Sequence, residues 1–160
     1  MSPQLLWTIA GLILTVLTLG GVSISSYQSM DSAKSKLIAS EVGNIATAAK
    51  LWMVNSSTAG TFDGINANAM TRYIPDLTVD GAGTPATSTF VSKADPTVTF
   101  LVEKATGSAA DDSYKISVAG VGMTVSNKAL LTTNLTGKSC TVANADAATA
   151  ATAVTYTCKG

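Results

Sequence analysis

The first 30 residues of the chain form an uncharged and strongly apolar segment. The stretch from Leu5 to Ile24 contains no ionisable side chain and is interrupted only by scattered Thr, Gly and Ser. A helix of about 20 mainly apolar residues is long enough to cross a bilayer. All acidic and basic side chains lie between Asp31 and Lys159. The pattern therefore predicts a membrane-spanning segment over residues 1–30 and a globular domain over residues 31–160.

Two other interpretations of this segment fit less well. A cleaved secretory signal has a basic start and a small-residue cleavage site, and neither is present here. A buried core helix would need more covering than a remainder of about 130 residues provides. The flanks of the segment are unusual for an anchor, because Lys34 and Lys36 follow it and nothing basic precedes it. Removal of a basic leader ahead of Met1 would account for this.

Beyond the apolar segment, the chain continues with a helical period. Five apolar residues recur at intervals of four and three and define one helix face: Ile38, Val42, Ile45, Ala49 and Trp52. No proline lies between residues 4 and 74, so nothing forbids one helix from about Pro3 to about Val54. Such a helix is roughly 75–80 Å long at 1.5 Å per residue. We expect its second half to pack on a domain.

Two adjacent glycines, Gly20 and Gly21, interrupt the apolar half of this helix. Each glycine costs about 1 kcal/mol of helix stability relative to alanine. The pair is thus the expected site of flexibility or melting. The alternative is that the glycines allow close contact between helices, as small residues do in membranes.

The remainder of the chain predicts a small α+β domain. Residues 58–96 are rich in turn formers and are expected to be a long connection with a short helix near Ala67–Tyr73. Alternating or β-branched runs then predict three antiparallel strands, over 97–103, 113–120 and 152–159, with a hairpin loop over 105–112. Ser126 is positioned to cap a short helix that reaches Leu131. The Ala/Thr-rich residues 143–153 are expected to form a loop.

Cys140 and Cys158 enclose 17 residues near the C-terminal end of the chain. A disulfide between them would stabilise the domain by roughly 3 kcal/mol. It would also indicate an oxidising compartment, the periplasm or the exterior. Two free buried thiols are the alternative.

Composition argues against most catalytic and nucleic-acid-binding functions. Charged residues make up only 12% of the chain, the formal net charge is zero and histidine is absent. Without a basic field, no nucleic-acid site is expected, and without histidine neither ordinary acid–base catalysis nor a metal site is favoured. The notable carboxylates are Glu103 and the pair Asp111–Asp112. A solvated loop explains that pair better than a Ca²⁺ site. We expect no enzyme activity and no cofactor.

Taken together, these features resemble the type IV pilin family in its mature, leaderless form. The resemblance spans the whole chain at the level of architecture, and residues 23–52 are most similar to the type IVb branch, which includes bundlin and the toxin-coregulated pilin. It implies that a prepilin peptidase removes a basic leader and N-methylates Met1. It further implies a bitopic inner-membrane protein that assembly machinery polymerises into an extracellular pilus, or fimbrium.

Polymerisation is expected to bury the apolar segment in the core of a filament made of identical subunits. The residues expected in that core are Leu5, Leu6, Trp7, Ile9, Leu12, Ile13, Leu14, Val16, Leu17, Leu19, Val22 and Ile24. The family usually has a glutamate where this chain has Leu5. That glutamate is thought to pair with the N-terminal amine of a neighbouring subunit, and Leu5 cannot do so.

Three alternatives stay open at this point. The first is a minor pilin or a type II secretion pseudopilin, since some of these proteins also lack the glutamate. The second is a monomeric, membrane-tethered binding domain. The third, an enzyme, is disfavoured as above. The Thr- and Ser-rich surface is compatible with glycan modification, and Asn55 and Asn134 each begin an N-glycosylation tripeptide. Adhesion, aggregation, motility and DNA transfer are all compatible roles.

Overall fold

A computed structural model describes residues 33–56, 60–81, 84, 87–106, 113–120, 131, 135, 139–143 and 153–160. The chain divides into two compact units, Met1–Lys34 and Ser35–Gly160. Nearly all of the first unit lies outside the described residues, so the description below concerns the second.

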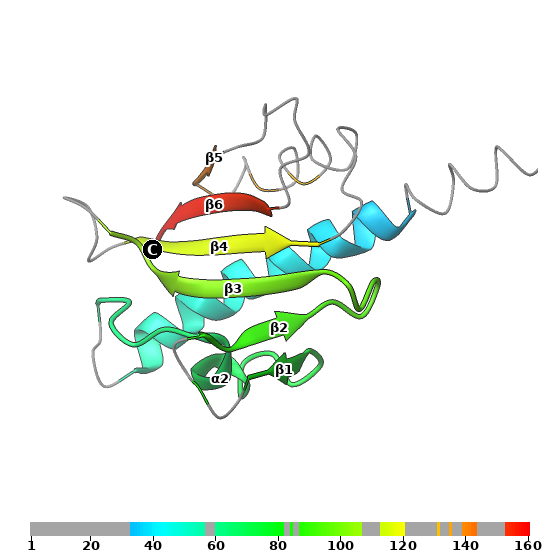
Figure 1. Ribbon diagram of the computed structural model, residues 1–160. Coiled ribbons are helices and arrows are strands. Elements are labelled where there is room, and N and C mark those ends of the chain that lie inside the picture. Colours follow the sequence, from blue (N-terminus) through cyan, green and yellow to red (C-terminus); the bar gives the residue numbers. More distant parts are fainter. Residues whose placement is uncertain are drawn as a thin grey trace, which may run out of the picture. The chain divides into compact units, whose positions relative to one another are not determined.

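The second unit combines helices with an antiparallel sheet (Figure 1). A long helix covers residues 33–55 and is followed by the short helix α2 (Ala67–Met70). The strands are β1 (Thr78–Asp80), β2 (Thr89–Val91), β3 (Thr99–Lys104), β4 (Ser113–Ala119), β5 (Cys140–Ala143) and β6 (Ala153–Lys159). The α+β class, the antiparallel sheet and the C-terminal disulfide predicted from the sequence are thereby confirmed.

All strand pairs are antiparallel, and the order across the sheet is β1-β2-β3-β4-β6-β5. Strands β3, β4 and β6 are the longest and form the centre, where Phe100 pairs with Val118 and Val118 with Val154. The short strands β1 and β5 form the two edges. Strand β6 lies between β4 and β5, so the last strand of the chain is internal.

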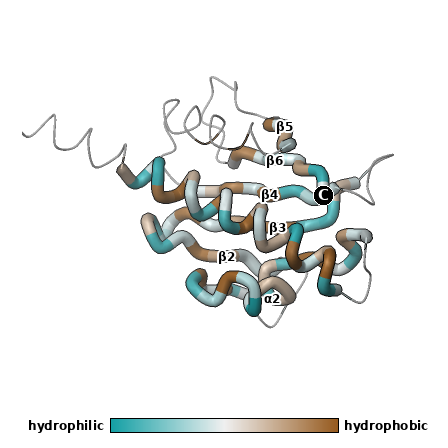
Figure 2. Tube along the Cα trace, turned by 180° about the vertical axis from the view of Figure 1, so that it is seen from behind, coloured by the Kyte–Doolittle hydropathy of each residue, from teal (hydrophilic) through white to brown (hydrophobic). Residues whose placement is uncertain are grey.

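The long helix covers one face of this sheet (Figure 2). Alternate strand residues point to it, because side chains of a strand alternate between faces. Those alternate residues are buried and include Phe90, Phe100, Ile116, Val118 and Val154. Buried alanines on the helix, such as Ala46 and Ala49, permit close approach to the strands. The core therefore lies between one helix and one sheet face, as expected for two packed layers.

Local signals fix the turns on the β1 side of the sheet. Asn66 caps α2, with its side chain accepting a hydrogen bond from the backbone N–H of Ala69 at 2.9 Å. Gly81 follows β1 with a φ of +74°, a conformation that glycine adopts at little cost. Next to β4, a Cβ atom on Gly120 would lie 2.8 Å from Val98 Cγ2, so the close approach of these segments requires glycine.

The structure contains three short strands that the sequence analysis did not predict. The connection predicted over residues 58–96 contains strands β1 and β2. Cys140–Ala143 also forms a strand, β5, so Ala143 does not belong to a loop. Each missed strand has only three or four residues, too few to show a period of two, and each is held by pairing with the strand next to it in the chain. The strands predicted over 97–103, 113–120 and 152–159 differ from β3, β4 and β6 by at most two residues at either end.

Candidate functional site

The helix face predicted to lie on the sheet is buried. Relative exposures are 8% for Ile38, 9% for Trp52 and 0% for Val42, Ile45 and Ala49. All five belong with Phe100, Ile116 and Val154 to a single hydrophobic core. This face is buried inside the folded domain and is therefore unavailable to a partner.

The opposite face of the same helix is exposed and carries no charge. We call it the outer stripe, and it consists of Leu37, Ser40, Asn44, Thr47, Leu51 and Val54. Its three apolar members are 57%, 49% and 68% exposed for Leu37, Leu51 and Val54 respectively. Leu51 and Val54 are neighbours on the helix, whereas the polar residues Ser40, Asn44 and Thr47 separate them from Leu37, so the stripe is a mixed polar and apolar surface.

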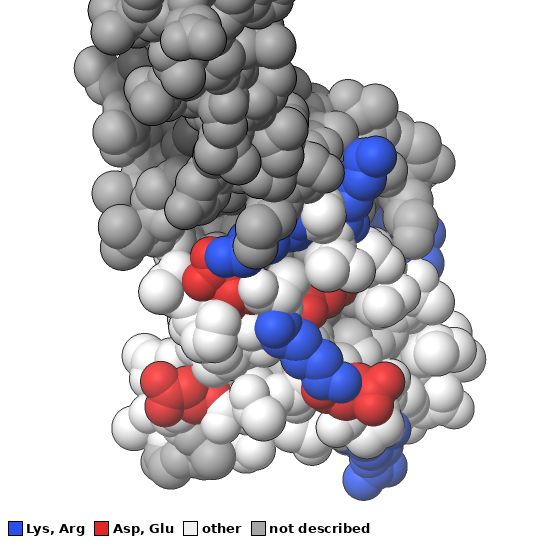
Figure 3. All heavy atoms as spheres, turned by 90° about the vertical axis from the view of Figure 1, so that its right-hand side faces the viewer, with Lys and Arg blue, Asp and Glu red and all other residues white. Residues whose placement is uncertain are grey.

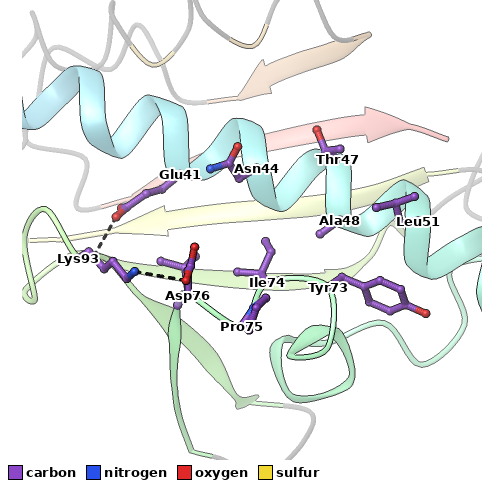
Figure 4. A pocket seen from close by; sticks show the side chains of 11 residues that line it. Glu41, Asn44, Thr47, Ala48, Leu51, Tyr73, Ile74, Pro75, Asp76 and Lys93 are labelled. Atoms are coloured by element: carbon purple, nitrogen blue, oxygen red, sulfur yellow. Dashed lines mark hydrogen bonds and ion pairs between the residues drawn. The ribbon is translucent and has the colours of Figure 1, made fainter.

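A groove of about 400 Å³ runs beside the outer stripe. One wall is the helix, from Glu41 to Leu51, and the other is the segment from Tyr73 to Leu77 that follows α2 (Figure 4). The end near Leu51 and Tyr73 is mainly apolar. The other end carries the charges of Glu41, Asp76 and Lys93.

A polar cluster closes the charged end of the groove. The carboxylate of Glu41 accepts hydrogen bonds from the hydroxyl of Ser92 at 2.5 Å and from the backbone N–H of Lys93 at 2.9 Å. The Ser92 hydroxyl oxygen in turn accepts from the backbone N–H of Ala94 and of Asp95. We call this arrangement the Glu41 clasp. It ties the middle of the helix to the turn between β2 and β3.

The far edge of the sheet is held covalently. Cys140 and Cys158 form a disulfide and are direct partners in the pairing of β5 with β6, with Cα atoms 4.0 Å apart. Cys158 is fully buried and Cys140 is 7% exposed. No free cysteine remains, so the alternative of two free thiols does not hold.

Two buried tyrosines on neighbouring strands differ in their hydrogen bonding. The Tyr114 hydroxyl donates to the backbone carbonyl of Ala46 at 3.1 Å, which connects β4 to the helix. The Tyr156 hydroxyl has no hydrogen-bond partner in the described part of the structure. Burial raises the pKa of Tyr114 to about 12, and it raises the pKa of Tyr156 further. Both phenols stay neutral at ordinary pH.

An exposed ion pair lies on the β3 side of the sheet. Lys104 Nζ is 2.6 Å from Asp63 Oδ1. The hydrogen bond from Lys104, and then its positive charge, lower the pKa of the Asp63 carboxyl. On the face drawn in Figure 3, acidic and basic groups are interspersed among uncharged residues. No single-sign field is visible on that face.

The described residues offer no constellation for catalysis or metal binding. Glu103 is exposed on β3 opposite Lys115, and the pair Asp111–Asp112 lies outside the described residues. No group of three potential metal-ligating side chains occurs in the described part of the chain. In the same part, no helix has the length and apolar character needed to cross a bilayer.

Several predicted site residues lie outside the described residues. These are Met1, Gly20, Gly21 and all twelve residues assigned to the filament core. Of the two glycosylation tripeptides, only Asn55 is described, and its side-chain amide donates to the carbonyl of Leu51 at 2.9 Å. Leu131 is helical and buried, but Ser126, its predicted cap, is outside the described residues.

Comparisons with protein-family models, curated proteins and solved structures find no match for this chain. The functional argument therefore rests on the chain itself.

The sequence analysis missed the outer stripe and the groove. The stripe has a visible signal, since Leu37, Asn44 and Leu51 are seven residues apart. The groove has none, because it depends on where the Tyr73–Leu77 segment lies against the helix.

Proposed function

We propose that this protein is the structural subunit, a major pilin, of an extracellular type IV pilus. The observation that carries the proposal is the pairing of two unlike segments in one chain. Residues 1–30 are uncharged and mainly apolar, and the next segment is a helix with one face committed to an antiparallel sheet. In a filament, a globular domain of this kind lies on the outside, and the apolar segment is buried in the interior.

The physical basis of assembly is the removal of apolar surface from water. An apolar segment that leaves a bilayer must bury its surface again, and bundling with identical segments does so. A repeated head-to-tail contact that does not close on itself produces a helical fibre. On this proposal the subunit is bitopic in the inner membrane until a prepilin peptidase and the assembly machinery act on it. Met1 is then the processed, methylated residue.

Leu5 favours a second candidate, a minor pilin or a pseudopilin. A subunit without the usual glutamate cannot pair a carboxylate with the N-terminal amine of its neighbour. Such a subunit would be incorporated rarely, or would prime a filament built from another chain. A membrane-tethered binding domain that does not polymerise is the remaining candidate.

Cryo-electron microscopy of filaments sheared from native cells, combined with mass spectrometry of their content, tests the proposal. We expect this chain to form the bulk of the filament, with a modified Met1 and with residues 1–30 packed in its core. Filaments built mainly from another chain would refute the major-pilin proposal and favour the minor subunit. Protein that stays monomeric in detergent, on cells without filaments, would favour the tethered domain.

A further inference from the structure

The end of the long helix carries a motif that the proposed function does not use. Asn55, Ser56 and Ser57 form the tripeptide that N-glycosylation requires, an asparagine followed two positions later by serine or threonine. Asn55 is the last residue of the helix and is exposed, and Ser56 forms the bend after it. The acceptor asparagine therefore lies at an exposed helix end, where a bulky and hydrophilic glycan can be accommodated.

The hydrogen bond of the Asn55 side chain is compatible with a sugar on the same nitrogen. The amide nitrogen, Nδ2, donates to the backbone carbonyl of Leu51 at 2.9 Å. A side-chain amide has two N–H groups, and a glycosidic bond replaces only one of them. The other N–H keeps the bond to Leu51. A glycan can therefore be attached to Asn55 without rearrangement of the helix end.

Two exposed apolar side chains lie next to this asparagine. Leu51 is 49% exposed and Val54 is 68% exposed. Leu51 precedes Asn55 by one helical turn on the same face, and Val54 is its neighbour in the chain. Because a helix side chain covers the turn before its own Cα, a sugar on Asn55 lies over Leu51. The non-polar faces of sugar rings can then cover aliphatic carbons that folding leaves in water.

The second glycosylation tripeptide has a different environment. Its middle residue, Leu135, is helical, fully buried and part of the hydrophobic core. A transferase that binds this tripeptide in the folded domain would have to expose Leu135 in order to reach Asn134. The exposed helix end at Asn55 requires no such opening of the core. Asn55 is therefore the favoured acceptor of the two.

The disulfide agrees with the compartment that this modification needs. Cys140 and Cys158 are bonded, and disulfides persist in oxidising compartments, where secreted chains also acquire N-linked glycans. From these observations we infer that Asn55 carries an N-linked glycan that covers Leu51 and Val54. The modification does not depend on polymerisation. It applies equally to a filament subunit and to a tethered domain, so it stands or falls separately from the pilin proposal.

Glycan transfer to Asn55 needs a donor and a transferase. The donor is an oligosaccharide joined through its anomeric carbon to a lipid diphosphate. A bond forms between Nδ2 of Asn55 and the anomeric carbon, while the bond from that carbon to the diphosphate oxygen breaks. The lipid diphosphate leaves with the electron pair, and the proton lost from Nδ2 passes to a base of the transferase. Ser57 supplies the hydroxyl that defines the tripeptide.

Mass spectrometry of the full chain from native cells tests the site. Trypsin releases residues 51–72 as one peptide, in which Asn55 is the only asparagine of a glycosylation tripeptide. We expect this peptide to carry a glycan that is lost in Asn55→Gln and in Ser57→Ala. Ser56→Ala leaves the tripeptide intact and should keep the glycan. An unmodified peptide in the native protein, or a glycan that survives Asn55→Gln, would overturn the proposal.

Hydroxyl-radical labelling tests whether the glycan covers its apolar neighbours. The glycosylated protein is compared with the Ser57→Ala variant, which lacks the glycan. We expect the glycosylated form to lose label at Leu51 and Val54. Leu37, which is 57% exposed on the same helix, is the matched control and should be labelled equally in both forms. Equal labelling of Leu51 and Val54 in the two forms would overturn the covering role.

Discussion

The two edges of the sheet are held in different ways. At the β1 edge, residues 60–104 are joined to the helix and to one another by hydrogen bonds and ion pairs, chiefly the Glu41 clasp and the Asp63–Lys104 pair. At the β5 edge, one disulfide ties the outermost strand to β6. The first edge depends on groups whose charge or hydrogen bonding can be altered singly. The second depends on a covalent bond and hence on the redox state of its surroundings.

The comparison indicates where each edge would fail. A short edge strand has few ladder hydrogen bonds and is readily lost unless something else retains it. Strand β1 has three residues and β5 has four. We therefore expect reduction to loosen β5 and leave β1 in place. Loss of the Glu41 clasp should loosen the turn between β2 and β3 and leave β5 in place.

Removal of the disulfide should have the largest effect. We expect the double variant Cys140→Ala/Cys158→Ala to lose about 3 kcal/mol of unfolding free energy, because the unfolded chain regains the entropy of an open loop. Denaturant titration measures this loss. Hydrogen exchange should accelerate most at the amides of Cys140–Ala143.

The control for this prediction is Thr141→Ala, an exposed change in the same strand, which should have little effect. Reductant should destabilise the natural protein and leave the double variant unchanged. Equal acceleration of exchange in β1 and β5 would contradict the idea that the edges are held independently.

Glu41→Gln tests the opposite edge. The amide that replaces one carboxylate oxygen cannot accept from both Ser92 and the backbone N–H of Lys93, so at least one charge-assisted hydrogen bond is lost. We expect a loss of about 2 kcal/mol in unfolding free energy. Faster exchange should be confined to the turn between β2 and β3.

Ser40→Ala serves as the control, since Ser40 is exposed one residue away on the same helix. If Glu41→Gln left the exchange of residues 92–98 unaltered, the clasp would not be what holds this turn.

Substitution of the two buried tyrosines tests the packing of the central strands β4 and β6, which lie between the two edges. Tyr114→Phe removes the hydrogen bond to Ala46 and should cost about 1 kcal/mol. Tyr156→Phe removes a buried hydroxyl without a partner in the described structure and should be neutral or stabilising by up to about 1 kcal/mol. Denaturant titration of both variants provides the comparison, and a larger loss for Tyr156→Phe would refute it.

Alkaline pH tests the contribution of Tyr114 in a second way. The pKa of Tyr114 rises from 10.0 to about 12 in the folded protein because burial disfavours the phenolate. Its contribution to stability is thus complete below pH 10 and is lost as pH rises through about 12. Tyr114→Phe should flatten the fall in stability over that range, as measured by thermal unfolding at several pH values.

Much of the fold follows from local pattern, and the candidate surfaces follow from it only in part. Ile38, Val42 and Ile45 recur at helical spacing, so the buried helix face is legible in the sequence. Strand β4 shows the same clarity, because Tyr114, Ile116 and Val118 alternate with polar residues. The pattern that predicts each of these elements lies entirely within the residues of that element.

The remaining features depend on residues far apart in the chain. Glu41 and Ser92 are 51 residues apart, and no pattern along the sequence couples them. Strands β1 and β2 were missed for another reason: they pair with neighbours in the chain, but each has only three residues, which is too short to show an alternation. The outer stripe also recurs at helical spacing, but half of its residues are polar, and the apolar period of the buried face is stronger.

The smallest expected effect concerns the Asp63–Lys104 pair. The pair is largely exposed, so its removal in Asp63→Asn should hardly change the unfolding transition at neutral pH. The effect of the pair should instead be visible in the pKa of Asp63. Because the folded-state pKa of Asp63 is lowered from 3.8, its contribution is present above that value and is lost as pH falls through the folded pKa. An NMR titration should find the Asp63 carboxyl ionised below pH 3.8, and Lys104→Met should return its pKa toward 3.8. If Lys104→Met left the pKa of Asp63 unchanged, the shift would reflect the charge of the whole domain, and the pair would not distinguish this edge from the disulfide-bonded one.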